Sequence, residues 1–130
     1  MARILVLEDD KDALELLECL LELLGHDVTG VCDGNEGLKA KPETFDAIIL
    51  DLRMPVIDGQ AFKRELDERA VTVPVIIMSA EARVDSVASE MGAFDYLRKP
   101  AELSSVSAVV SRALAANGAS PMGPTGGSAS

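Results

Sequence analysis

Acidic side chains follow two of the short apolar segments in this sequence. Glu8 and Asp9 come directly after the apolar run at 4–7, and Asp51 comes directly after the run at 47–50. An ionised carboxylate at the end of a buried strand is costly unless it has a partner. Carboxylates that are brought together also repel one another, unless a cation lies among them. The pattern therefore points to a cation site to which Asp51 contributes.

Two further groups that suit phosphate chemistry follow other apolar segments. Ser79 comes after the run at 73–78, and Lys99 comes shortly after the segment at 94–97. Functional groups of an open parallel sheet gather at the carboxyl ends of its strands. Mg²⁺ takes oxygen ligands there and keeps positions open for water and phosphate oxygens. With a hydroxyl and an ammonium opposite the metal, Asp51 could attack phosphorus as a nucleophile.

Each of these residues also has a purely structural explanation. Acids often cap helices or face solvent, and we assign Asp10, Asp12 and Asp58 to that role. Ser79 alone could be a turn residue, and Lys99 alone could be a surface charge. Their coincidence at four separate strand ends favours a shared site.

Short apolar segments alternate with stretches of helical periodicity along the chain. Strands are predicted at 4–7, 26–31, 47–50, 73–78 and 94–97. Helices are predicted at 11–24, from a turn at 33–34 to about 41, at 59–69, 81–91 and 101–116. Such alternation predicts an α/β fold, a parallel sheet with helices on both faces and right-handed crossovers.

The ends and faces of two helices can be predicted in more detail. Asp12 with Glu15 resembles a capping box at the start of the first helix, and Gly25 suits the position after its end. In the last helix an apolar face is expected to point inward, formed by Leu103, Val106, Val109, Val110 and Ala113.

Composition limits the classes of partner. The chain has 130 residues, 48% of them apolar, and 12 basic against 22 acidic residues give a net charge of −10. One folded domain is expected at 1–117, followed by a disordered Gly/Ser/Pro tail or linker stub at 118–130. The acidic balance argues against direct binding to nucleic acid or to an anionic membrane surface.

The remaining candidate sites are weak. Cys19 and Cys32 form no metal or redox motif, and we expect two reduced, partly buried thiols. His26 has no acid or cysteine partner at ligand spacing, so we treat it as structural. No segment is long enough to span a bilayer, and the first ten residues do not form a signal peptide. A cytoplasmic protein is the expectation.

Four segments together resemble one known family. "ILVLEDD", "DLRMPVIDG", "VIIMSA" and "YLRKP" occur in the order and spacing of the receiver domains of two-component response regulators. The resemblance covers residues 3 to about 116. It implies a flavodoxin-like, doubly wound (βα)5 sheet with the strand order 2-1-3-4-5.

The resemblance also implies roles for individual residues. Asp51 would accept a phosphoryl group from a phosphohistidine of a sensor histidine kinase or a phosphotransfer protein. Mg²⁺ would be held by Glu8, Asp9, Asp51 and the backbone carbonyl of Arg53, with Asp9 binding directly and Glu8 through water. Ser79 and Lys99 would bind phosphoryl oxygens. Glu8 stands where Asp is frequent in the family, and Ser79 where Thr is frequent, and both keep the oxygen chemistry.

Further features of the family concern loops and signalling. Pro55 and Gly59 would shape the loop after Asp51, and the Lys99–Pro100 bond is often cis. Ser79 and Tyr96 would form the conformational switch. The surface made by the helix at 81–91, the strand at 94–97 and the helix at 101–116 would signal to a downstream protein.

Two other functions compete with this one. A haloacid-dehalogenase-type phosphatase also uses an aspartate nucleophile and Mg²⁺, but its second aspartate would stand where this chain has Arg53. A pseudo-receiver would bind a partner without phosphorylation. We expect a receiver that turns over no external substrate, either acting alone or within a larger regulator or hybrid kinase.

Overall fold

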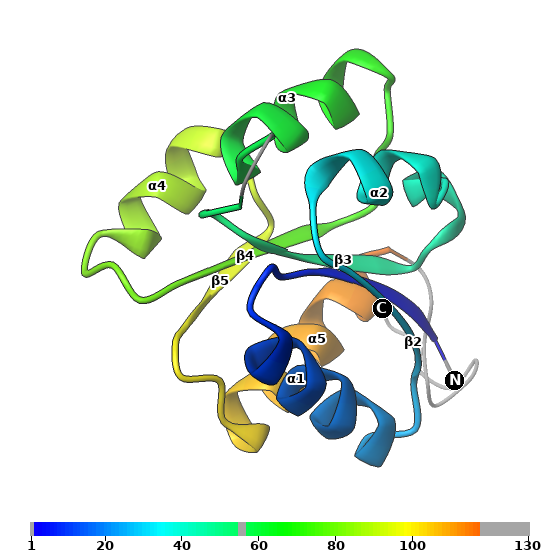
Figure 1. Ribbon diagram of the computed structural model, residues 1–130, viewed down its shortest axis with the longest axis vertical. Helices are drawn as coiled ribbons and strands as arrows, with labels where there is room; N and C mark the ends of the chain where they lie inside the picture. The colour runs from blue at the N-terminus through cyan, green and yellow to red at the C-terminus, as the bar shows by residue number, and fades with distance from the viewer. Residues whose placement is uncertain (1, 55–56, 118–130) are drawn as a thin grey trace.

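The computed structural model describes residues 2–54 and 57–117, which form one parallel sheet with helices on both faces (Figure 1). The strands are β1 (Arg3–Leu7), β2 (Asp27–Val31), β3 (Ala47–Asp51), β4 (Val75–Ser79) and β5 (Asp95–Arg98). The helices are α1 (Lys11–Leu23), α2 (Gly34–Lys39), α3 (Gly59–Glu68), α4 (Val84–Met91) and α5 (Leu103–Ala116), with a short 3-10 helix η1 (Pro42–Thr44). The strand order is β2-β1-β3-β4-β5. The predicted α/β class and strand order are therefore confirmed.

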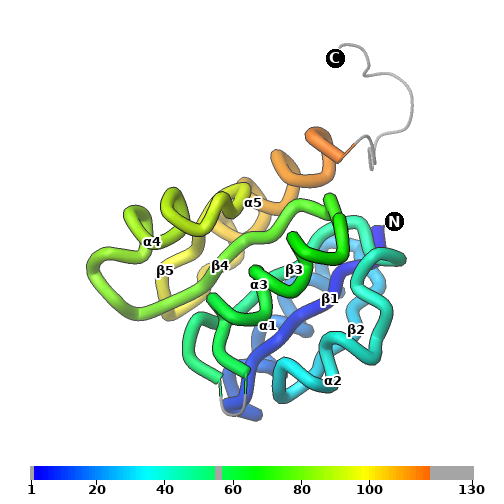
Figure 2. The backbone as a smooth tube through the Cα atoms, turned by 90° about the horizontal axis from the view of Figure 1, so that it is seen from above, coloured from blue at the N-terminus to red at the C-terminus, as the bar shows by residue number. Residues whose placement is uncertain are grey.

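Two apolar layers fix the sheet between its helices. Helices α1 and α5 cover one face, and α2, α3 and α4 cover the other (Figures 1 and 2). Along β1, Ile4 and Val6 pack in the layer under α1 and α5, whereas Leu5 and Leu7 pack in the layer that contains Phe62 of α3. Because successive side chains of a strand point to opposite faces, a strand buried on both faces is a continuous apolar run.

Several boundaries differ from the predicted ones by one to three residues. Strands β3, β4 and β5 extend to Asp51, Ser79 and Arg98, so each reaches further toward the expected site than the apolar run alone indicates. Helix α4 begins at Val84 rather than at 81, because 81–83 belong to the loop after β4. The short η1 was not predicted.

The N-terminus of α1 corrects the predicted capping box. Asp10 is the N-cap, and its carboxylate accepts hydrogen bonds from the backbone N–H groups of Asp12 (2.9 Å) and Ala13 (3.2 Å). Asp12 lies inside the first turn and is exposed. The assignment of Asp12 and Glu15 to a capping box is therefore wrong, because the helix begins two residues earlier than that motif requires.

Asp10→Ala is expected to destabilise the fold by about 1 kcal/mol, because two N–H groups of the first turn lose their acceptor. Asp10→Asn keeps an acceptor and should have little effect. Urea unfolding of both variants measures the difference. A larger loss of unfolding free energy in Asp12→Ala than in Asp10→Ala would support the capping box after all.

Two other helix ends agree with the predictions made from the sequence. Gly25 has a φ of +91° after the end of α1, and its N–H and that of His26 bond to the carbonyls of Glu22 (2.9 Å) and Leu21 (3.1 Å). This is a Schellman motif, in which glycine adopts the left-handed conformation without a steric penalty. Asp58 caps α3, with its carboxylate accepting from the N–H of Ala61 at 2.9 Å, as predicted.

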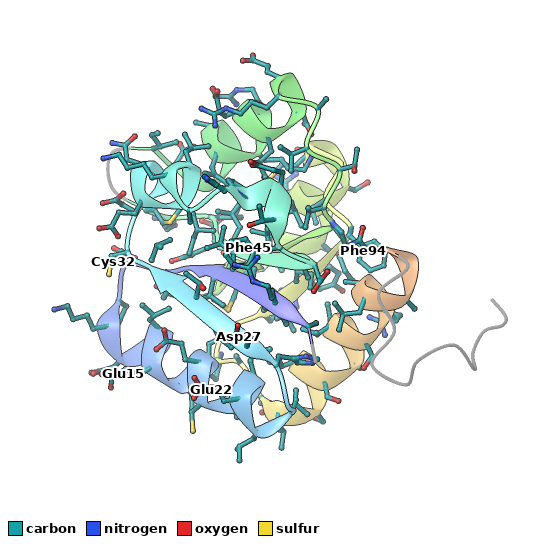
Figure 3. All side chains as sticks on the ribbon, turned by 90° about the vertical axis from the view of Figure 1, so that its right-hand side faces the viewer. Glu15, Glu22, Asp27, Cys32, Phe45 and Phe94 are labelled. Carbon is teal, nitrogen blue, oxygen red and sulfur yellow. The ribbon has the colours of Figure 1, made fainter. Side chains whose placement is uncertain are left out.

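Some predicted burial is wrong. Leu103 is 43% exposed, because it is the first residue of α5 and lies beyond the sheet-facing part of the helix, whereas Leu114 is fully buried. Cys19 is exposed on α1 and Cys32 is half-buried, so only Cys32 fits the expected burial, and neither forms a disulfide. Figure 3 shows Glu15 and Glu22, which are both exposed, on α1.

The structure leaves two predictions untested and bears on a third, which concerns membrane-spanning helices. The predicted tail at 118–130 and Pro55 lie outside the described residues. Within 2–54 and 57–117, no helix has both the length and the apolar character needed to cross a membrane.

Candidate functional site

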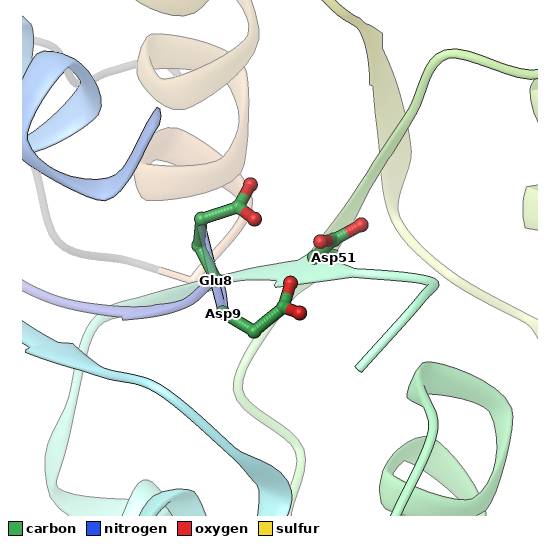
Figure 4. A group of neighbouring side chains, drawn as sticks. All are labelled: Glu8, Asp9 and Asp51. Carbon is green, nitrogen blue, oxygen red and sulfur yellow. The ribbon is translucent and has the colours of Figure 1, made fainter. Parts of the chain in front are cut away.

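Three carboxylates meet where β1 and β3 end. Leu7 pairs with Leu50 in the sheet, so the residues that follow, Glu8 and Asp51, lie side by side. One carboxylate oxygen each from Glu8, Asp9 and Asp51 lies within 4.8 Å of the others. Figure 4 shows the three side chains around a common space. Glu8 and Asp51 are buried, and Asp9 is exposed at the mouth.

Lys99 brings a positive charge to the two buried acids. Its Nζ lies 2.9 Å from Oε1 of Glu8 and 3.2 Å from Oδ2 of Asp51. The backbone N–H of Lys99 donates to the carbonyl of Ser79 at 3.0 Å, which fixes the start of the segment after β5 against the end of β4. The Lys99–Pro100 peptide bond is cis, as the resemblance implies.

Burial and the neighbouring charged groups shift the pKa values of both Glu8 and Lys99. Burial raises the pKa of Glu8, and the neighbouring Asp51 carboxylate raises it further, although Lys99 and the N–H of Asp10 oppose this. Burial lowers the pKa of Lys99, but the Glu8 and Asp51 carboxylates outweigh it, so the pKa of Lys99 is raised overall. Lys99 therefore remains an ammonium at neutral pH.

The donor set fits a hard divalent cation. Oε1 of Glu8 is buried and accepts no well-aligned hydrogen bond from the described residues, although Lys99 Nζ is close. The Asp9 carboxylate takes part in none of the hydrogen bonds found within 2–54 and 57–117, so its oxygens are available. The buried carboxylates of Glu8 and Asp51, together with the available carboxylate of Asp9, offer the oxygen ligands that Mg²⁺ prefers.

Ser79 lies at the same edge of the sheet. Met78 pairs with Asp51, so Ser79 is one residue beyond it on the neighbouring strand. Ser79 is buried, and its Oγ accepts a hydrogen bond from the N–H of Glu81 at 3.0 Å. Because this bond uses only a lone pair of the hydroxyl, the hydroxyl proton remains available for another acceptor.

Arg53 contacts the site through its backbone and the neighbouring loop through its side chain. Its N–H donates to Oδ1 of Asp51 at 3.2 Å. Its guanidinium Nε and Nη2 lie 2.8 Å and 2.6 Å from Oε2 of Glu81. The metal-binding role of its carbonyl stays a prediction. The pair with Glu81 was not predicted, since the two residues lie in loops 28 positions apart.

Tyr96 lies in β5, two residues before the strand ends at Arg98. It is half-buried and packs against the apolar layer under α3 and α4. The guanidinium carbon of Arg98 lies 5.8 Å from the centre of its ring. The switch role of Tyr96 stays a prediction, as do the phosphoryl-binding roles of Ser79 and Lys99.

Gly59 sits where α3 approaches the site strand. A Cβ at this position would lie 2.8 Å from the carbonyl oxygen of Asp51 and 2.8 Å from the Cα of Leu52. Both are backbone atoms, which cannot rotate away. The N–H of Gly59 also donates to the carbonyl of Leu52 at 3.0 Å.

Gly59→Ala is accordingly expected to cost about 1–3 kcal/mol of stability, as overpacking does, and to displace the Asp51 backbone. Gln60→Ala, at the next, exposed position, is the control and should change stability little. Thermal unfolding compares the two. Equal melting temperatures would show that the loop accommodates the methyl group without strain.

Known proteins with similar sequences are regulators. The family model described as the response regulator receiver domain matches residues 4–111. The chain is 42% identical over 120 residues to the transcriptional regulatory protein PrrA of Mycobacterium leprae, covering 90% of this chain and 52% of that protein. It is 38% identical over 112 residues to the DNA-binding transcriptional regulator NtrC of Salmonella typhimurium, covering 84% of this chain and 24% of that protein. The chain thus spans about half, or less, of these relatives.

Solved structures of receiver domains have the same fold. A response regulator receiver domain protein from Clostridium thermocellum aligns with a TM-score of 0.82 and 31% identity, covering 91% of this chain and 98% of that one. The receiver domain of a sensor histidine kinase from Pseudomonas aeruginosa, with a magnesium ion coordinated in its active-site cleft, aligns with a TM-score of 0.78 and 32% identity, covering 88% and 98%. This chain belongs to the family of response regulator receiver domains.

Proposed function

We propose that Asp51 accepts a phosphoryl group from the phosphohistidine of a sensor histidine kinase or phosphotransfer protein. The observation that carries the proposal is the position of the Asp51 carboxylate, which lies beside the Lys99 ammonium and within 4.8 Å of carboxylate oxygens of Glu8 and Asp9. A receiver domain with magnesium in its active-site cleft is among the similar structures. Glu8, Asp9, Asp51 and the carbonyl of Arg53 would hold Mg²⁺ in this chain.

The transfer is a substitution at phosphorus. A carboxylate oxygen of Asp51 forms a bond to phosphorus as the bond from phosphorus to the donor imidazole nitrogen breaks, and the electron pair of that bond returns to the imidazole. The product is an acyl phosphate. Lys99 offsets charge that develops on the equatorial phosphoryl oxygens, and the Ser79 hydroxyl donates a hydrogen bond to one of them. Bound Mg²⁺ would supply further positive charge to the same oxygens.

The modified domain then signals to a partner. The phosphoryl group adds negative charge and acceptor oxygens at the buried edge of the sheet. Ser79 moves toward it, and the Tyr96 ring turns into the space left behind. The face made by α4, β5 and α5 reads this change and contacts the downstream protein. The chain turns over no external substrate in this scheme, and water later cleaves the acyl phosphate at the same site.

The proposal is tested with a small-molecule phosphodonor. We expect the protein with Mg²⁺ and acetyl phosphate to gain the mass of one phosphoryl group, and to gain none when EDTA removes the metal. Intact-mass spectrometry at neutral pH measures both. An unmodified protein under the first condition, with partner binding that ignores Mg²⁺, would instead identify a phosphorylation-independent pseudo-receiver.

A further inference from the structure

Arg98 holds the loop that follows Ser79. It is the last residue of β5 and pairs with Ser79, the last residue of β4. Its Nη1 donates to the carbonyl of Glu81 at 3.2 Å and to that of Ala82 at 3.0 Å. Both carbonyls belong to the 80–83 loop between β4 and α4. A half-exposed side chain on the sheet is therefore the anchor of this loop from the β5 side.

The same loop residue positions the Ser79 hydroxyl. The N–H of Glu81 donates to Ser79 Oγ, and the carboxylate of Glu81 binds Arg53. Glu81 is thus held through its carbonyl by Arg98 and through its side chain by Arg53. Because the hydroxyl of Ser79 is bonded to this residue, movement of Ser79 away from its present position also moves the loop.

Arg98 also contacts the proposed switch residue. Its guanidinium carbon is 5.8 Å from the centre of the Tyr96 ring, within the range of a cation–π interaction. One side chain therefore contacts both the loop of Ser79 and the aromatic ring that is expected to move after it. Within 2–54 and 57–117, no other cation–π contact involves Tyr96.

We propose that Arg98 is a positioning residue that holds the 80–83 loop and the Tyr96 ring in the unphosphorylated arrangement and couples their release. The inference rests on the proposed function, because it is phosphorylation that draws Ser79 toward Asp51. Arg98 is fixed on β5, so its bonds to the loop carbonyls are lost when the loop follows Ser79. Contacts made in only one of two forms favour that form, and removing them shifts the population to the other.

Tyr96 provides the readout. It is the only tyrosine, and the chain has no tryptophan, so intrinsic emission reports on this ring alone. The protein with Mg²⁺ is titrated with beryllofluoride, a phosphoryl analogue. Arg98→Ala is expected to lower the half-saturating concentration by roughly threefold to tenfold, where tenfold corresponds to about 1.4 kcal/mol. Its emission without ligand should already be shifted toward the bound value.

Two variants serve as controls. Arg98→Lys keeps the charge but lacks the planar guanidinium that reaches two carbonyls. Its half-saturating concentration of beryllofluoride should therefore lie between those of wild type and Arg98→Ala. Arg83→Ala removes the same charge from the end of the same loop and should behave as wild type. Arg83 has no side-chain hydrogen bond with the described residues.

The outcomes separate this inference from the proposed function. Beryllofluoride binding to Arg98→Ala that equals or is weaker than binding to wild type would overturn the inference alone. An equal gain in Arg83→Ala would also overturn it, because the effect would then be one of net charge. A wild-type protein with no Asp51-dependent response would defeat the proposed function, and the inference with it.

Discussion

Asp51→Asn is expected to leave the protein folded and to abolish its phosphorylation by acetyl phosphate. The amide keeps the shape of the side chain but has no anionic oxygen to attack phosphorus. It also removes one of three crowded negative charges, so the fold should tolerate it. Intact-mass spectrometry measures the adduct, and circular dichroism verifies the fold. The expected result is complete loss of the adduct at a donor concentration that saturates wild type.

Asp58→Asn is the matched control for this prediction. It makes the same chemical change seven residues later in the chain, and asparagine caps a helix about as well as aspartate does. The variant should be phosphorylated like wild type. An adduct that persists in Asp51→Asn would place the phosphoryl group on another residue and remove the chemical basis of the proposed function.

Asp9→Asn is expected to remove most of the stabilisation that Mg²⁺ gives the wild-type protein. A cation that binds only the folded state stabilises it by about 2.7 kcal/mol at a concentration of 100 times its Kd. Asp9 is the exposed carboxylate of the three, so it can bind a metal without losing hydrogen bonds to the described residues. Thermal melting with and without Mg²⁺ measures the effect.

The metal-free proteins provide a second comparison for the same variant. Without Mg²⁺, Asp9→Asn should melt no lower than wild type, because the substitution relieves repulsion with Glu8 and Asp51. Asp12→Asn, an exposed acid in the first turn of α1, should retain the full response to Mg²⁺. A response that survives in Asp9→Asn, or one that is lost in Asp12→Asn, would contradict the proposed ligand set.

The sequence predicted the fold well because its central strands are continuous apolar runs. The segments at 4–7, 47–50 and 75–78 are buried on both faces, and few other structures accommodate such runs between helical stretches. Element ends were harder, since they depend on single hydrogen bonds. Asp10 and Asp12 both have carboxylates near the start of α1, and only the path of the backbone determines which one caps it. Burial near a helix end is equally hard to predict: Leu103 fits the apolar periodicity of α5, but as the first residue of the helix it is exposed.

The gathering of the site residues was predictable for a different reason. Parallel strands place their carboxyl ends at one edge, so side chains that follow separate runs must meet there. Glu8, Asp51 and Lys99 do so. The contacts of Glu81 with Arg53 and Arg98 were not predictable, because they join loop residues whose spacing carries no periodic signal. Arg98 matched the family segment "YLRKP", but nothing in that segment indicates that its side chain reaches the loop after Ser79.

In the proposed function, Glu8, Asp9 and Asp51 surround a magnesium ion beside a phosphoryl group on Asp51, and Lys99 and Ser79 bind the oxygens of that group. A crystal structure of the wild-type protein with Mg²⁺ and beryllofluoride tests it most directly. We expect beryllium to be bonded to a carboxylate oxygen of Asp51, a metal ion to be bound by Asp9 and Asp51, and fluorine atoms to lie within hydrogen-bond distance of Lys99 Nζ and Ser79 Oγ. Beryllofluoride bound elsewhere, or a metal ion that contacts neither Asp9 nor Asp51, would contradict it.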